Sequence, residues 1–91
     1  MAKKNYNKYE DPGHGWLKVT RKELVRLGIL DKITGFSYQR GDFVYLEEDC
    51  DLSTFLDAKE KIDGLSYSEI IIKSQHTNNE SRIRNYYSFQ A

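Results

Sequence analysis

The densest group of reactive side chains is a run of four carboxylates around Cys50: Glu47, Glu48, Asp49 and Asp51. Carboxylate oxygens can bind a divalent cation or a basic surface on another molecule. The spacing does not match the calcium loop of an EF-hand, because the required glycine and final glutamate are absent. We therefore expect a solvated acidic surface rather than an ion site, with Tyr45 adding aromatic contact area.

Cys50 lies close to a predicted helix N-terminus, which favours the thiolate, but the neighbouring carboxylates disfavour it. We interpret it as a small, semi-buried residue and not as a nucleophile. His14 and His76 could form a metal site or an acid–base pair with a carboxylate of the acidic run. Nothing in their spacing requires them to meet, so locally bonded or exposed imidazoles are the simpler interpretation. We expect no cofactor.

A second group near the C-terminus combines guanidinium groups with aromatic rings: Arg82, Arg84, Tyr86 and Tyr87. These are the ingredients for phosphate contacts and base stacking. On a strand, Arg82, Arg84 and Tyr86 would share one face, whose simplest use is ion pairing with the acidic run. Nucleic-acid binding is the alternative, and the lysines of the first ten residues would supplement it: Lys3, Lys4 and Lys8.

The formal net charge is zero, but this is a cancellation between segments. Residues 1–40 carry nine basic and four acidic side chains, residues 41–72 carry two and nine, and residues 73–91 carry three and one. An acidic face results if the fold keeps the middle segment on one side. The alternative is that the charges intermix on the surface.

Length and composition indicate one folded domain, since the chain has 91 residues of which 38% are hydrophobic. One cysteine cannot form an internal disulfide, and no apolar stretch approaches the roughly 20 residues needed to span a bilayer. We expect a cytoplasmic protein without membrane contacts. Residues 1–10 are polar without periodicity and are predicted to be a flexible basic arm, followed by a single domain over residues 11–91.

Local signals place the first half of the domain. Asp11-Pro12-Gly13 predicts a turn, and the alternation over residues 14–19 predicts a strand with Trp16 opposite Leu17 and Val19. Thr20 and Glu23 form a capping box for a short helix that ends at Gly28. Residues 33–39 and 43–47 predict a hairpin, whose central pair is either Arg40-Gly41 or, preferably, Gly41-Asp42.

Helical and strand patterns continue through the second half. Asp51 is the predicted N-cap of a helix whose inner stripe contains Leu52, Phe55, Leu56 and Ile62, with Gly64 just beyond its end. Residues 66–74 predict a strand buried on both faces, and residues 81–89 predict a last strand. The order β-α-β-β-α-β-β predicts an α+β fold, a small and mostly antiparallel sheet with two short helices on one face.

Three blocks of the sequence resemble a family of small uncharacterised proteins encoded by bacteriophages and mobile elements. They are the segments Asp11 to Val19, Ser37 to Asp51, and His76 to Tyr86. The resemblance implies a phage accessory protein that binds and inhibits a host protein, such as a nuclease or another part of the host defence machinery. It carries no catalytic role to any residue.

The leading hypothesis is therefore a non-enzymatic protein that engages a basic host surface through Glu47, Glu48, Asp49, Asp51 and Tyr45. Nucleic-acid binding through the basic termini is the second hypothesis. A small metal-dependent hydrolase built on His14 and His76 is the third. The oligomeric state is not indicated by the sequence.

Overall fold

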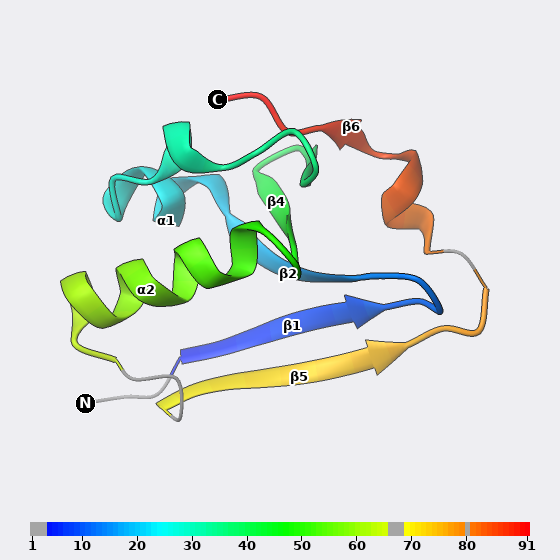
Figure 1. Ribbon diagram of the computed structural model, residues 1–91, viewed down its shortest axis with the longest axis horizontal. Helices are drawn as coiled ribbons and strands as arrows, with labels where there is room; N and C mark the ends of the chain where they lie inside the picture. The colour runs from blue at the N-terminus through cyan, green and yellow to red at the C-terminus, as the bar shows by residue number, and fades with distance from the viewer. Residues whose placement is uncertain (1–3, 66–68, 80) are drawn as a thin grey trace.

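The fold is a twisted six-stranded sheet with its two α-helices on one face, seen in a computed structural model that describes residues 4–65, 69–79 and 81–91 (Figure 1). The strands are β1 (Lys4–Glu10), β2 (Gly15–Thr20), β3 (Tyr38–Arg40), β4 (Phe43–Glu47), β5 (Ile70–His76) and β6 (Tyr87–Ser88). The helices are α1 (Arg21–Arg26) and α2 (Asp51–Asp63), with the 3₁₀ helices η1 (Leu30–Lys32) and η3 (Arg82–Asn85). The strand order is β5-β1-β2-β4-β3-β6. The predicted α+β class is confirmed.

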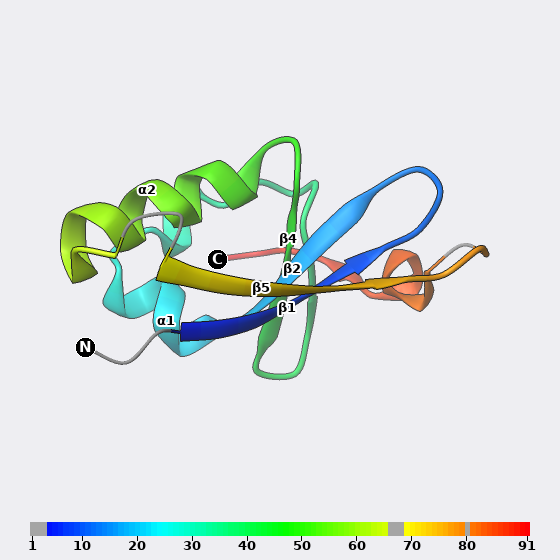
Figure 2. The ribbon, with the colours of Figure 1, turned by 90° about the horizontal axis from the view of Figure 1, so that it is seen from below.

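Residues 4–10 form a strand inside the sheet, so the prediction of a flexible arm is wrong for them. β1 pairs antiparallel with β2 and parallel with β5, and this parallel pair is the exception in a sheet whose other described pairs are antiparallel (Figure 2). Tyr6 is buried, and its hydroxyl donates to the Glu23 carboxylate at 2.9 Å. Neighbouring strands on both sides satisfy the backbone hydrogen bonds of β1. This pairing does not depend on apolar side chains, so a polar segment can also form a strand. Residues 1–3, including Lys3, lie outside the described residues.

The sheet separates two groups of buried side chains, as the alternation in the sequence predicts. Leu17 and Val19 of β2 pack with Leu24 of α1 and Phe55 of α2 in the main core. Trp16 points to the opposite face, where it packs in a second cluster with buried Tyr45 and Ile83. We call this second side the aromatic face.

Helix α1 begins and ends at the predicted residues. Its N-cap Thr20 accepts a hydrogen bond from the Glu23 amide at 3.2 Å, and the Ile29 amide donates to the Leu24 carbonyl across Gly28, whose φ is +70°. The reciprocal bond of the predicted capping box is not among the described interactions. The Glu23 carboxylate instead accepts from Tyr6 and pairs with the buried Lys59 and the exposed Arg26.

The hairpin has the preferred register but a shorter first strand. Arg40 pairs with Phe43, which leaves Gly41 and Asp42 as the central pair, and Gly41 has a φ of +59°. The predicted strand over residues 33–39 is wrong for residues 33–37. That segment is held as a loop because Thr34 donates its amide and hydroxyl to the Asp51 carboxylate.

Helix α2 starts one residue earlier than predicted. Cys50 occupies the N-cap position without a side-chain hydrogen bond, and Asp51 is the first helical residue, with 1% of its surface exposed. The helix ends at Gly64 as predicted, with a left-handed φ of +67°. Its inner stripe contains Leu52 and Phe55, but Ile62 is 59% exposed, so that part of the stripe is wrong.

Lys59 takes an inner position instead and is the centre of a buried charge network. Its ammonium group is fully buried and lies 3.0 Å from Glu23 Oε2, and it also donates to Asp63, which Arg26 holds with two bonds of 2.8 Å. Burial acts to lower the pKa of Lys59, but the hydrogen bonds with Asp63 and Glu23 outweigh it and leave that pKa raised. Burial, together with the hydrogen bond to Glu23, raises the pKa of Tyr6 to about 12. The network thereby ties β1, α1 and α2 together.

The strand centred on Ile70 to Ile72 is confirmed. Its composition predicts burial on both faces, but its position in the sheet is different. Ile70 is buried and Ile72 is partly buried on the core face of β5. β5 lies at the edge of the sheet, next to β1 only. The burial of Ile71, and residues 66–68 of the predicted strand, lie outside what the structure describes.

Replacing Lys59 tests the charge network. We expect Lys59→Ala to lower the free energy of unfolding by about 3–5 kcal/mol, because it leaves the Glu23 and Asp63 carboxylates close together without their buried counter-charge. Urea unfolding followed by circular dichroism measures this. Lys61→Ala, on the exposed side of the same helix, is the control and should change stability by no more than about 0.5 kcal/mol. Equal losses in the two variants would contradict a stabilising role for the network.

Candidate functional site

Asp11 organises the part of the molecule where both candidate sites lie. Its fully buried carboxylate accepts hydrogen bonds from the amides of Gly13 at 2.9 Å, His14 at 3.0 Å and Ser81 at 2.9 Å. Arg84 adds two more, from Nε at 2.6 Å and from Nη2 at 2.9 Å. These bonds stabilise the charged form, so the pKa of Asp11 lies far below its usual range, mainly because of Arg84.

The Asp11 contacts explain why the last segment is not a strand. Ser81 caps η3 by accepting from the Ile83 amide, and Ile83 is buried against the aromatic face. The prediction of one strand over residues 81–89 is therefore wrong, and only Tyr87 and Ser88 pair with β3. A tight 3₁₀ turn lets Ser81, Ile83 and Arg84 all reach the sheet, which a straight strand would not.

The four predicted nucleic-acid contacts separate into different environments. Arg84 turns inward to Asp11, with its guanidinium 5.4 Å from the Trp16 ring centre, and not toward the acidic run as predicted. Arg82 and Tyr86 line a cavity on the aromatic face. Tyr87 is 82% exposed and is not among the lining residues of that cavity.

This cavity, which we call the tyrosine cavity, is a broad depression of about 800 Å³ between the sheet and η3. Its volume lies in the range of ligand-binding clefts. Its cationic and aromatic lining residues are Lys18, Arg40, Arg82, Tyr9, Tyr45 and Tyr86. They come from four strands, η3 and the residue that follows η3.

The three tyrosines form one continuous wall. The ring centres of Tyr45 and Tyr86 are 5.1 Å apart, and those of Tyr9 and Tyr45 are 6.3 Å apart. Burial, helped by Tyr86 and Tyr9, raises the pKa of Tyr45, so its phenol is neutral at physiological pH. Tyr45 was predicted to support an acidic surface, and it is instead a buried residue at the base of this wall.

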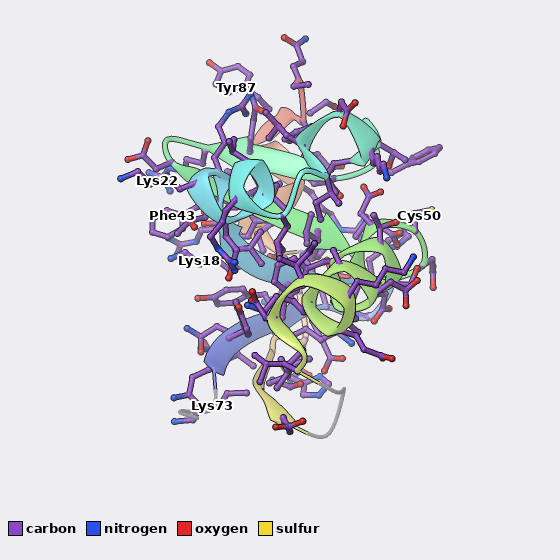
Figure 3. The ribbon with its side chains drawn as sticks, turned by 90° about the vertical axis from the view of Figure 1, so that its left-hand side faces the viewer. Lys18, Lys22, Phe43, Cys50, Lys73 and Tyr87 are labelled. Atoms are coloured by element: carbon purple, nitrogen blue, oxygen red, sulfur yellow. The ribbon has the colours of Figure 1, made fainter. Side chains whose placement is uncertain are left out.

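Positive charge exceeds negative charge around the tyrosine cavity. Lys18 Nζ lies 4.0 Å from the Phe43 ring centre, and the two side chains lie together in Figure 3. Arg40 donates to the Tyr86 hydroxyl at 3.2 Å, and Arg82 is exposed with no ion pair among the described residues. The lining carboxylate, Glu10, is already occupied by Lys8 and His76.

The acidic run does not form the surface that its sequence predicts. Glu47 and Asp51 are buried, and Asp51 accepts hydrogen bonds from Thr34 and Ser37. Glu48 is paired with Lys8 at 2.9 Å, so Lys8 is no free phosphate contact either. Only Asp49 of the four is exposed. These carboxylates mainly form hydrogen bonds and ion pairs within the protein, because the polar loops beside them offer hydrogen-bond donors.

Cys50 is exposed rather than semi-buried, and it sits at the edge of the molecule opposite Lys18 and Phe43 in Figure 3. Desolvation and the carboxylates of Glu47, Asp51 and Asp49 raise the pKa of its thiol. The thiolate is therefore disfavoured, as a non-nucleophilic role requires.

The two histidines contact different carboxylates. His14 Nδ1 lies 3.5 Å from Glu47 Oε1, and His76 Nε2 lies 2.8 Å from Glu10 Oε1. Within the described part of the chain, the group of potential metal ligands is His14, Glu47 and Asp49, without His76. The hypothesis of one metal site shared by both histidines is therefore wrong, because His76 does not join the ligand group of His14.

Comparisons with known proteins do not extend these observations. No family model matches the chain, and neither a curated protein nor a solved structure is significantly similar to it. The resemblance to phage proteins, and the host partner that it implies, stay predictions. No helix in the described part of the chain has the length and apolar character needed to cross a membrane.

Sequence reasoning missed Asp11, Lys18 and Arg40 as residues of the site. A signal existed for each: Asp11 opens a turn in which its side chain can accept from the following amides. Lys18 shares a face of β2 with Trp16, and the preferred hairpin register places Arg40 opposite Phe43. None of these signals could show that η3 would enclose the same face.

Replacing Asp11 tests its role through the pH dependence of stability. A carboxyl group whose pKa is depressed by folding adds stability above its unfolded pKa, and this contribution is lost as the pH falls through the folded pKa. We expect Asp11→Asn to lower the free energy of unfolding by about 3–5 kcal/mol at pH 7. The difference from the wild type should shrink as the pH falls below about 4.

Urea unfolding at several pH values measures both effects, with Asp57→Asn on the exposed side of α2 as the control. The control should stay within about 0.5 kcal/mol of the wild type. A loss in Asp11→Asn that is the same at pH 3 and pH 7 would contradict an electrostatic role for this carboxylate.

Proposed function

We propose that the protein binds single-stranded nucleic acid in the tyrosine cavity. The observation that carries the proposal is the joint lining of this cavity by Lys18, Arg40 and Arg82 and by a wall of tyrosine rings. Cationic side chains attract phosphates, and aromatic rings stack on unpaired bases.

The three cations of the cavity come from three separate elements. Lys18 is on β2, Arg40 is at the end of β3, and Arg82 is on η3, so the three cations surround the opening from different elements. A single small anion would need only one or two of them. A chain of phosphates that runs across the aromatic face would contact each in turn.

The tyrosines favour a single strand over a duplex. Tyr86 is partly exposed at the cavity and already accepts a hydrogen bond from Arg40, whose guanidinium lies 5.2 Å from the Tyr86 ring centre. A base can stack on such a ring only when it is unpaired and free to turn outward. In a duplex, the bases are stacked on one another and cannot enter the cavity.

The proposal keeps Arg82 and Tyr86 from the sequence-based hypothesis of nucleic-acid binding and replaces its other residues. Arg84 anchors η3 to Asp11 and is not a contact. The added contacts are Lys18, Arg40, Tyr9 and Tyr45. The hypothesis of an acidic surface for a host protein is less well supported, since it would have to rely on Asp49 and the partly exposed Glu48. Catalysis is not part of the proposal.

The salt dependence of binding tests the phosphate contacts. We expect labelled single-stranded DNA or RNA to bind in fluorescence anisotropy, with affinity that falls steeply as salt rises. Arg82→Ala should weaken binding to all sequences and reduce the slope of log K against log salt by about 0.7, the value for one phosphate contact on a single strand. Lys32→Ala removes an exposed lysine outside the cavity and should change neither quantity. Absence of binding at about 50 mM salt would refute the proposal.

Two neighbouring tyrosines offer a matched test of stacking. We expect Tyr86→Leu to weaken single-strand binding by about 1–3 kcal/mol, because it removes a ring in the cavity. Tyr87→Leu alters a ring that lies outside the cavity and should leave affinity unchanged. Equal effects of the two substitutions, or tighter binding of duplex than of single strands, would contradict base stacking in the cavity.

A further inference from the structure

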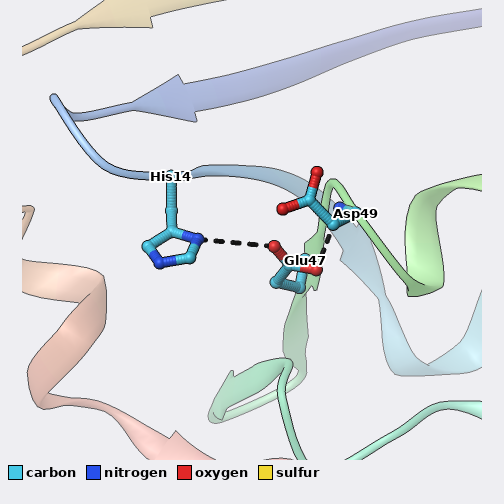
Figure 4. A group of neighbouring side chains, drawn as sticks. All are labelled: His14, Glu47 and Asp49. Carbon is cyan, nitrogen blue, oxygen red and sulfur yellow. Dashed lines mark hydrogen bonds and ion pairs between the residues drawn. The ribbon is translucent and has the colours of Figure 1, made fainter.

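A second cluster of polar side chains lies away from the tyrosine wall, where the β1–β2 turn meets the end of β4. His14 comes from the turn, Glu47 from the last position of β4, and Asp49 from the turn that leads into α2 (Figure 4). One ligand atom from each of these side chains lies within 4.8 Å of the other two. Residues far apart in the sequence thus bring one imidazole and two carboxylates to a common point.

The carboxylate of Glu47 lies buried at the centre of this cluster. Its side chain is only 9% exposed, and its Oε2 accepts a hydrogen bond from the Asp49 amide at 2.9 Å. The Cys50 thiol is also hydrogen-bonded to this carboxylate. Oε1 faces His14 Nδ1 at 3.5 Å, which is longer than an N–H···O hydrogen bond.

That separation fits two ligands of the same ion. Zinc binds imidazole nitrogen and carboxylate oxygen with bonds of roughly 2.0–2.2 Å in tetrahedral geometry, which places two such ligand atoms roughly 3.4 Å apart. The gap between His14 and Glu47 is therefore close to what a shared metal ion needs. A direct hydrogen bond would require the two side chains to move together.

The backbones that carry these ligands are held from behind. The His14 amide donates to Asp11 Oδ1 at 3.0 Å, and the Glu47 amide donates to the Ser37 hydroxyl at 2.9 Å. Ser37 is fully buried, as is the Asp11 side chain. Such supporting contacts fix the ligand positions before an ion arrives, which reduces the ordering cost of binding.

We propose that His14, Glu47 and Asp49 form a binding site for one divalent transition-metal ion. An imidazole with two carboxylates suits Zn²⁺ or Mn²⁺, whereas Ca²⁺ requires six to eight oxygen ligands. Two carboxylates balance the charge of the ion. The remaining coordination positions open toward an adjoining cavity of about 290 Å³, which Trp16 and Arg84 also line.

His76 and Glu10 supply an internal control for this site. They too are a histidine and a glutamate in contact, but their 2.8 Å separation is that of a direct hydrogen bond and the His76 side chain is 76% exposed. No third potential ligand joins them in the described part of the chain. A general affinity of histidine–carboxylate pairs for metals would therefore affect both pairs, and a built site only the first.

The test is titration of the purified protein with Zn²⁺ by calorimetry and with Mn²⁺ by electron paramagnetic resonance. We expect one ion per chain, and we expect His14→Ala and Asp49→Asn each to weaken affinity at least about 10-fold. His76→Ala should leave affinity unchanged. Both ligands to be replaced are exposed, and circular dichroism verifies that the variants are folded.

Nuclear magnetic resonance of the wild type provides a second measurement that needs no variant. Addition of Zn²⁺ should shift the imidazole signals of His14 and leave those of His76 in place. The proposal is overturned by a dissociation constant weaker than about 1 mM, by equal effects of His14→Ala and His76→Ala, or by shifts confined to His76.

Discussion

The ion pair between the buried Asp11 carboxylate and the partly exposed Arg84 is the interaction on which the arrangement of both sites depends. One carboxylate accepts bonds from the turn that carries His14 and from the segment that carries Arg82 and Tyr86. Because a buried carboxylate without its partners is costly, this interaction favours docking of the two segments together. Gly13 and Gly15 fit this crowded region, since a Cβ at either position would come within 3.0 Å of Arg84 or Glu48.

Several charged side chains are buried in this small domain and connect its elements. Lys59 is fully buried, and Asp51 is almost so, at positions where a chain of this size would be expected to place apolar side chains. Each is surrounded by partners from other elements, Lys59 by α1 and Asp51 by the loop before β3. Such networks add little net stability compared with well-packed apolar groups, but they penalise any misplacement of the elements they join. They therefore help to specify the packing of the two short helices.

The parts of the fold that could be predicted are those governed by neighbours in the sequence. Thr20, Gly28 and Gly64 mark helix ends through local hydrogen bonds and left-handed backbone conformations, and Gly41 marks the hairpin turn in the same way. The strand β1 could not be recognised, because its place between β2 and β5 depends on partners that the local pattern does not contain.

The candidate sites show the same limit. The composition of the acidic run predicts a solvated acidic surface. The environments of its carboxylates, however, are decided by distant residues such as Thr34 and Lys8. Arg82, Arg84 and Tyr86 were predicted to share one face of a strand. Arg84 instead lies apart from the other two because of the 3₁₀ turn that Asp11 holds. The parallel pairing of β1 with β5 also has a consequence for synthesis on the ribosome. β1 leaves first, and it must wait for residues 70–76 before the sheet closes. β1 can pair with β2 early, but its other edge stays open until β5 is made. Such pairing between distant segments slows folding, so the nascent chain offers a chaperone an open strand edge over a long interval.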